Sequence, residues 1–275
     1  MNNDLLTICI VNYNSADFIL NTLYCLEKIT KNKYKVIIRD NNSKIKDFKK
    51  LKRETQNYSN VFLYRINDFT YTGSIAHGIA LNDLLNRIDS SYGVILDADC
   101  TFLYKDWDEV LINRINNEYP VIGTPASYTE GEKRSGDFPL MYGILFITKV
   151  LKEFNIDFRP KHEGVYKDTG YTLKDYLIEH NYKGKILEEK NTRFIKSGPF
   201  SKIICVEYYL EGHEKIFACH FGRGSSLGRG KYLSGKKKSS FYFIPIIGNF
   251  LLKLKGKREK KLWIKICKEI VDNFD

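Results

Sequence analysis

The sequence has no closely spaced cysteine pair, although it contains six cysteines in 275 residues. None of the six forms the Cys-x-x-Cys spacing of a zinc site or a redox motif. This scatter argues against structural zinc and against a disulfide framework, and it predicts free thiols in a reducing compartment. The cysteines stand at positions Cys9, Cys25, Cys100, Cys205, Cys219 and Cys267.

A targeting segment and a membrane-spanning run are also missing. Residues 1–4 carry no basic region ahead of an apolar run, so we expect no secretory signal and a cytoplasmic protein. Residues 241–254 are apolar, but a stretch of 14 residues interrupted by Pro245 and Gly248 is too short to cross a bilayer.

Two common phosphate-binding motifs are absent as well. The first apolar run ends in Asn12-Tyr13-Asn14 and not in a Gly-x-Gly-x-x-Gly turn, so a Rossmann-type dinucleotide site lacks its phosphate loop. The pair Gly230-Lys231 does not complete a P-loop, because Ser225 replaces the first glycine and Tyr232 follows the lysine. Any bound phosphate must therefore be neutralised in another way.

The charge of the chain is unevenly placed. With 43% hydrophobic and 28% charged residues the composition is that of a globular protein, long enough for one large α/β domain with an appendage or for two small domains. Of the net charge of +11, residues 223–275 contribute 14 basic and 4 acidic side chains, whereas the remaining 222 residues hold 30 and 29. Such a tail suits anionic lipid or a phosphorylated ligand. Nucleic acid is disfavoured, because the surplus is confined to the tail and no recognised motif accompanies it.

Short apolar runs alternate with helical periodicity over the first hundred residues, which predicts a doubly wound, mostly parallel α/β sheet. Ligands bind such sheets at the carboxyl ends of the strands. Polar breaks follow three predicted strands, at residues 12–15, 40–43 and 97–99. Strands are expected over residues 5–11, 34–39, 61–65, 93–96, 121–124, 143–147, 203–210 and 216–219, and helices over about 15–29, 75–88 and 173–180.

The break Asp97-Ala98-Asp99 follows an apolar run directly. In an extended segment the two carboxylates point to the same side, and they repel unless a cation or hydrogen-bond donors compensate. Mg²⁺ or Mn²⁺ would do so and would carry a diphosphate with it. The alternative is an ordinary polar turn.

Four segments in order resemble the family 2 glycosyltransferases, which have the GT-A fold: ICIVNYNS, VIIRDNNS, YTGSIAHGIALNDLL and GVILDADC. The resemblance covers about residues 1–105 and implies a nucleotide-diphosphate-sugar donor with Mn²⁺ or Mg²⁺ as cofactor. It implies that Val11 and Tyr13 line the nucleotide base and that Asp40 accepts hydrogen bonds from it. It assigns Asp97 to the ribose and Asp99 to the metal.

Three further positions follow from the resemblance. In the family, a glycine is followed by a helical Asn-x-Gly motif. Here Gly73 is followed by His77-Gly78, so His77 takes the position where the family usually has an amide side chain. The alternative is a partly buried histidine that helps the helix to start.

The family's catalytic Glu-Asp pair is absent from this sequence. Asp168 is the first choice for the general base, with Glu163 as the fallback. Asp168 also suits a plain helix N-cap.

A histidine and a basic loop close the second half. His220 follows a predicted strand and resembles the metal-binding histidine of several GT-A enzymes, although a lone histidine is commonly structural. The Gly-, Ser- and Lys-rich residues 222–238 predict a mobile loop. Its cations can close over a diphosphate as a lid or form a solvated charge run; they are Arg223, Arg229, Lys231 and Lys236–Lys238.

The basic tail predicts an amphipathic helix, with Trp263, Ile266 and Ile270 on one face. Such a face suits an anionic membrane surface; the alternative is a helix packed on the body with its lysines in solvent. We therefore expect a GT-A domain over residues 1–222, with a donor half (1–105) and an acceptor half (106–222). A basic flexible loop (223–240) and the basic helical extension (241–275) follow.

The expected function is a metal-dependent, inverting glycosyltransferase acting on a surface-glycan or lipid-linked acceptor, in the cytoplasm or at the inner face of the membrane. One alternative is a degenerate relative that only binds nucleotide or membrane. Another is a sugar-1-phosphate nucleotidyltransferase, which would want a Gly-rich basic loop after the first strand that residues 12–15 do not supply.

Overall fold

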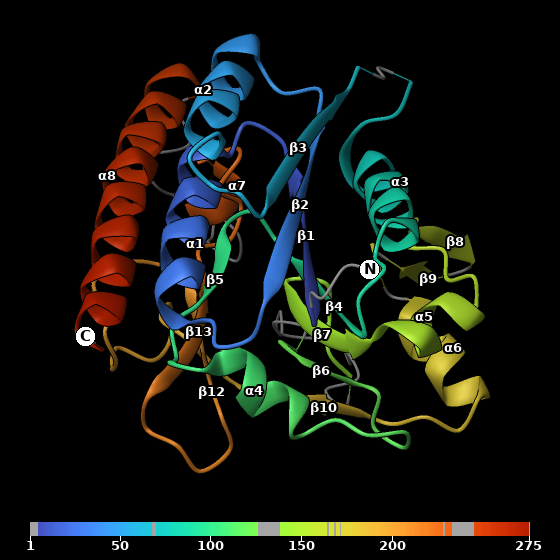
Figure 1. Cartoon of the computed structure of the whole chain (residues 1–275). Coiled ribbons are helices and arrows are strands. Elements are labelled where there is room, and N and C mark those ends of the chain that lie inside the picture. Colours follow the sequence, from blue (N-terminus) through green and yellow to red (C-terminus); the bar gives the residue numbers. More distant parts are fainter. Residues whose placement is uncertain are drawn as a thin grey trace.

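The first predicted strand, β1 (Leu6–Asn12), lies inside a seven-stranded sheet of order β10-β6-β7-β4-β1-β2-β3 (Figure 1). β1 pairs in parallel with β2 (Tyr34–Asn41) and β4 (Tyr92–Leu96), and β2 with β3 (Val61–Ile66). β7 (Gly143–Ile147) runs antiparallel to β4 and to β6 (Val121–Gly123), and β10 (Gly184–Ile186) is parallel to β6. The predicted mostly parallel α/β sheet is confirmed.

The computed structural model describes residues 5–67, 70–125, 138–163, 165–167, 169–170, 172–227, 229–232 and 245–274. Helices cover both faces of the sheet (Figure 1). One face carries α1 (Ala16–Ile29), α2 (Ile45–Thr55) and α8 (Pro245–Asp272), and the other carries α3 (Gly73–Asn86), α5 (Thr148–Glu153) and α6 (Thr172–Glu179).

The alternation of side chains along β1 explains these two layers. Ile8 and Ile10 join the core beneath α1 and α8, whereas Cys9 between them joins the core beneath α3. Because successive residues of a strand point to opposite faces, a strand covered on both sides is apolar at nearly every position. All six cysteines are buried and free, as predicted.

A second, four-stranded sheet joins the first at the end of β4. Its order is β11-β12-β13-β5, with β11 (Glu188–Asn191), β12 (Val206–Tyr209), β13 (Ile216–His220) and β5 (Cys100–Phe102). β5 begins directly after the Asp97–Asp99 break and pairs antiparallel with β13, so that His220 lies opposite Cys100. The remaining elements are α4 (Trp107–Ile112), the β8 (Lys161–Glu163) and β9 (Val165–Lys167) hairpin, and α7 (Arg229–Tyr232).

Several elements differ from the prediction. The helix expected over 75–88 begins at Gly73, and the strand expected over 203–210 is limited to Val206–Tyr209. The sequence did not indicate α2, because this helix is largely charged and buries only Leu51 and Thr55. Ile45, Phe48 and Leu51 do recur at helical spacing, but they are few among the charged residues of this segment.

The basic tail forms α8, which packs along α1 (Figure 1). Trp263 is fully buried, with its ring centroid 5.5 Å from that of Phe18 and 6.2 Å from that of Phe221. The helix face that contains Trp263 is therefore part of the core and does not contact a membrane. Of the two alternatives given by the sequence, packing of this face on the body is the correct one. None of the helices in the described ranges is long and apolar enough to cross a membrane.

Candidate active site

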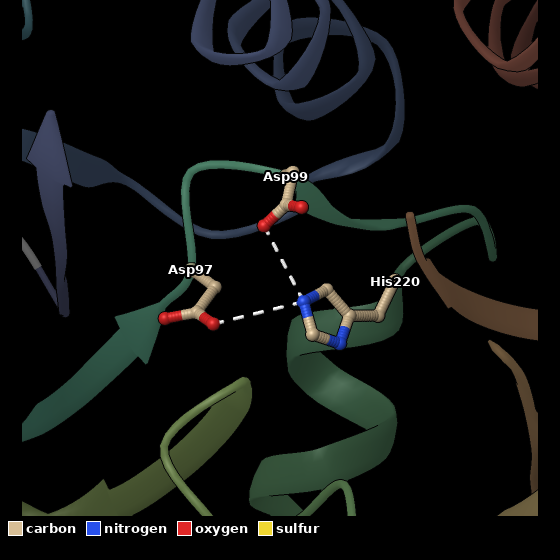
Figure 2. A group of neighbouring side chains, drawn as sticks. All are labelled: Asp97, Asp99 and His220. Atoms are coloured by element: carbon tan, nitrogen blue, oxygen red, sulfur yellow. Dashed lines mark ion pairs between the residues drawn. The ribbon is translucent and has the colours of Figure 1, made fainter. Parts of the chain in front are cut away.

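Asp97, Asp99 and His220 form a cluster at the carboxyl end of β4 (Figure 2). Nε2 of His220 lies 3.6 Å from Oδ2 of Asp97 and 3.3 Å from Oδ1 of Asp99. One ligand atom from each residue lies within 4.8 Å of the others. Within the described part of the chain, no other group of His, Cys, Asp and Glu side chains meets these conditions for a metal ion.

Backbone hydrogen bonds build this cluster from two segments that are distant in the sequence. The amide of Cys100 donates to the carbonyl of Asp97 at 2.9 Å, so Asp97–Asp99 forms a tight turn instead of the extended segment expected. The amide of Phe221 donates to the carbonyl of Asp99 at 2.8 Å and holds the end of β13 against that turn. The two carboxylates nevertheless both reach the imidazole of His220 (Figure 2).

The electrostatics of the cluster suit a cation. Burial by itself would raise the pKa of Asp99, but His220, the Gly224 amide and Lys231 outweigh it and hold that pKa below its usual value. Burial would likewise lower the pKa of His220, but the charges of Asp99 and Asp97 outweigh it and raise that pKa. A protonated His220 would thus offset the negative charge of the two carboxylates, as a bound cation would.

Gly224 is a site residue that the sequence analysis missed. Its amide donates to Oδ2 of Asp99 at 2.7 Å. A Cβ at this position would lie 2.7 Å from the ring of Phe18 and 2.8 Å from Oδ2 of Asp99. The loop turns toward the cluster through positive φ angles of 72° at Gly222 and 56° at Arg223. The repeated glycines of the Gly-Arg-Gly segment were the available signal, but they were interpreted as flexibility.

Two more side chains surround the cluster. The ring of Tyr142 stacks on His220 with centroids 4.7 Å apart, and the carbonyl of Tyr142 accepts a 2.9 Å hydrogen bond from the amide of Asp97. Nε2 of His77, on the first turns of α3, lies 3.9 Å from Oδ1 of Asp97. Gly73 begins that helix with a φ of 60°. The structure thus brings His77 to the acidic cluster.

The predicted nucleobase residues have different surroundings. Tyr13 is 55% exposed and Val11 is half-buried at the carboxyl end of β1. Asp40, in contrast, is fully buried. Its Oδ1 accepts a 2.7 Å hydrogen bond from Nδ2 of Asn12, and its Oδ2 lies 3.6 Å from Nε of Arg65. In this structure the carboxylate of Asp40 thus ties the ends of β1 and β2 together, and its assignment to the nucleobase stays a prediction.

The predicted general base lies outside the described residues. Asp168 is not described, and of Glu163 only the backbone, in β8, is described. Thr169, the next residue in the sequence after Asp168, donates from its hydroxyl to the carbonyl of Ser74 at 3.1 Å. Ser74 is in the first turn of α3, the helix that carries His77.

Part of the predicted lid lies within the described residues. The amides of Ser226 and Leu227 donate to the carbonyl of Arg223, whose side chain is exposed. Lys231 is buried in α7, and its Nζ donates to the carbonyl of Phe221. Burial lowers the pKa of Lys231 to about 8, against the opposing charges of Asp99 and Glu259. The side chain of Arg229 and residues Lys236–Lys238 lie outside the described part.

Comparison with known proteins gives a family and a fold. The sequence model of Glycosyl transferase family 2 matches residues 7–173, which is more than half of the chain. The mannosyltransferase PcManGT from Pyrobaculum calidifontis, solved in complex with GDP-Man and Mn²⁺, is 16% identical with a TM-score of 0.51, covering 68% of this chain and 55% of that one.

Residues 1–349 of S. aureus TarS, in complex with UDP-GlcNAc, are 17% identical with a TM-score of 0.47, covering 66% of this chain and 54% of that one. The chain therefore spans about half the length of these solved structures. A comparison with curated proteins gives no match.

Proposed function

Because the chain belongs to glycosyl transferase family 2, we propose that it is a metal-dependent, inverting glycosyltransferase that moves a sugar from a nucleotide-diphosphate sugar to an acceptor hydroxyl. The observation that carries this proposal is the cluster of Asp97, Asp99 and His220 at the carboxyl end of β4. Ligands of doubly wound sheets bind at that edge.

The three side chains of the cluster fit Mn²⁺ or Mg²⁺. Two carboxylates and one imidazole are hard and borderline ligands, and such a set leaves coordination positions for diphosphate oxygens. When bound, the ion stabilises the negative charge of the departing diphosphate. PcManGT, which shares the fold, binds GDP-Man and Mn²⁺, and a donor and metal of these classes are proposed here.

The residues of the chain take complementary roles in the proposed reaction. The exposed ring of Tyr13 lies where it can stack on a nucleobase, and Val11 lines the same edge. His77 and Asp97 lie together and are assigned to the nucleoside side of the donor. The ammonium of Lys231 and the guanidinium groups of Arg223 and Arg229 are assigned to the diphosphate.

The chemical step is a single displacement at the anomeric carbon. The acceptor oxygen forms a bond to that carbon while the bond to the diphosphate oxygen breaks, and the acceptor proton passes to the carboxylate of Asp168. Glu163 is the alternative base. A surface glycan or a lipid-linked glycan is the proposed acceptor, and the cytoplasm or the inner face of the membrane is the proposed location.

A donor screen tests this proposal. Nucleotide sugars are incubated with the full chain and Mn²⁺ or Mg²⁺, and the released nucleoside diphosphate is measured. We expect one donor to be turned over and a chelator to abolish its turnover. Asp99→Asn keeps an acceptor oxygen for the Gly224 amide but loses the charge, so turnover should fall about a hundredfold or more. Glu269→Gln, an exposed change on α8, is the matched control.

Two results would contradict the proposal. Turnover that survives both the chelator and Asp99→Asn would remove the metal role. Nucleotide binding without transfer or donor hydrolysis, over the whole panel of donors, would support the degenerate binding module instead.

A further inference from the structure

The first half of α8 presents a second apolar face, which points away from the body. Phe250 is 63% exposed, Leu251 is 39% exposed and Leu254 is 38% exposed. These three residues, called here the outer apolar patch, lie within five positions of one another. Side chains of this size are seldom left so exposed together unless they meet a partner.

The packing of the opposite side fixes this orientation. Leu252 is buried. A Cβ at Gly256 would lie 2.5 Å from the carbonyl oxygen of Leu227, so the helix lies directly on the loop that contains Leu227. Oε2 of Glu259 accepts a 2.9 Å hydrogen bond from the hydroxyl of Tyr232. Since a helix turns about 100° per residue, Phe250 and Leu254 lie on the side opposite Leu252 and Gly256.

The charged residues in the first half of α8 are all basic, although Lys255 also reaches Glu259 in the next turn at 3.7 Å. Lys253, Lys255, Lys257 and Arg258 are all exposed, and residues 245–258 contain no Asp or Glu. Apolar side chains ringed by basic ones are the surface that binds anionic phospholipid, because the apolar groups enter the acyl boundary while the cations meet the headgroups. An acidic protein partner would match the cations but would not require three adjacent apolar side chains.

The side of α8 opposite the patch packs on a loop of the candidate active site. Gly256 packs on Leu227, and Leu227 belongs to the loop in which Gly224 holds Asp99. α8 lies at the edge of the molecule beside α1, with no other labelled element on its outer side (Figure 1). A bilayer that contacts this side would therefore present lipid-linked molecules near the loop.

We propose that the outer apolar patch, with Lys253, Lys255, Lys257 and Arg258, docks the protein on an anionic phospholipid bilayer. The docking surface is the outward side of the first half of α8, and not the Trp263 side in the second half. Docking itself does not depend on the proposed function; only the supply of a lipid-linked acceptor rests on it.

Vesicle sedimentation with the full chain tests the proposal. The vesicles contain phosphatidylcholine alone or phosphatidylcholine mixed with phosphatidylglycerol. We expect binding to the mixed vesicles, little binding to the neutral ones, and weaker binding as salt increases. Deleting residues 241–275 is not a useful test, because this also removes Trp263 from the core.

Point variants identify the surface. Phe250→Ser, Leu251→Ser and Leu254→Ser combined should weaken binding about tenfold or more, since little of their apolar area then enters the bilayer. The matched control is Ile45→Ser with Phe62→Ser, two exposed apolar residues on α2 and β3. The control should bind like the unchanged protein. Lys253→Glu with Lys257→Glu should abolish the preference for phosphatidylglycerol.

Three outcomes would overturn the proposal. One is the absence of binding to mixed vesicles. Another is equal binding by the unchanged protein and the triple serine variant. The third is a dimer of the unchanged protein that the triple variant converts to a monomer, with no vesicle binding by either. Asp99→Asn should bind vesicles normally, which separates failure of docking from failure of the proposed catalysis.

Discussion

The backbone amide of Gly224 donates a 2.7 Å hydrogen bond to Oδ2 of Asp99, across 125 positions of sequence. The other carboxylate oxygen, Oδ1, lies 3.3 Å from Nε2 of His220. One oxygen of Asp99 is thus held by the loop after β13, while the second points into the cluster. A fixed carboxylate loses less freedom when it binds a cation, so we expect the loop to strengthen the proposed metal binding.

Gly224→Ala tests this contribution. The added Cβ would lie 2.8 Å from Oδ2 of Asp99 and 2.7 Å from the ring of Phe18, so the loop or the carboxylate must move. We expect Mn²⁺ affinity to fall about tenfold or more while the fold remains, as measured by calorimetric titration and circular dichroism. Ser225→Ala, at an exposed neighbour, should have no effect. Equal affinities for the two variants would show that Gly224 does not position Asp99.

The pH dependence of metal binding follows from His220. A cation requires the neutral imidazole, and Asp99 and Asp97 together outweigh burial and raise the pKa of His220. Below this raised pKa the imidazolium excludes the cation, so Mn²⁺ affinity should fall as the pH is lowered from about 9 to about 5. His220→Asn should bind Mn²⁺ more weakly and with a flatter profile. A steep profile in that variant would assign the proton to another group.

The stability of the metal-free protein should change in the opposite direction. Because the pKa of His220 is raised by folding, its ion pairs with Asp97 and Asp99 stabilise the fold at pH values below the unfolded pKa. That contribution is lost as the pH rises through the folded pKa. Denaturant unfolding of the metal-free protein and of His220→Asn over the same range should show the difference between them shrinking at high pH.

Lys231 predicts a second pH effect. Burial lowers its pKa to about 8, so the ammonium loses its proton as the pH rises through this value. Affinity for a nucleoside diphosphate with Mn²⁺ should therefore decrease above about pH 8, a decrease that Lys231→Met should largely lack. Lys231→Arg, which stays charged, should bind similarly at low and high pH. A decrease of the same size in all three proteins would exclude Lys231 as its source.

The orientation of α8 can be tested through stability. Trp263 is fully buried, and its Nε1 donates to Sγ of Cys219 at 3.1 Å. Trp263→Ala should lower the free energy of unfolding by about 3–5 kcal/mol. Phe250→Ala, on the outward side, should change it by less than about 1 kcal/mol. Denaturant unfolding measures both, and similar values for the two variants would contradict the orientation described.

Much of the sheet and of its ligand-binding edge was predictable from the sequence. β1, β2 and β4 are short apolar runs that end in polar residues, and parallel pairing brings their ends together. Asp97 and Asp99 could be proposed as a pair because they are neighbours in the chain. α2 was not predicted, because its few apolar residues, Ile45, Phe48 and Leu51, stand among many charged ones.

The sequence by itself determined the alternation of strands and helices and the acidic end of β4, because these depend on local apolar periodicity. Only the tertiary structure decided that His220 meets Asp99, since this requires the antiparallel pairing of β5 with β13. It also decided that Asp40 is buried and that Trp263 faces the core. Periodicity shows that a helix has an apolar face, but what covers that face depends on the segments that fold against it.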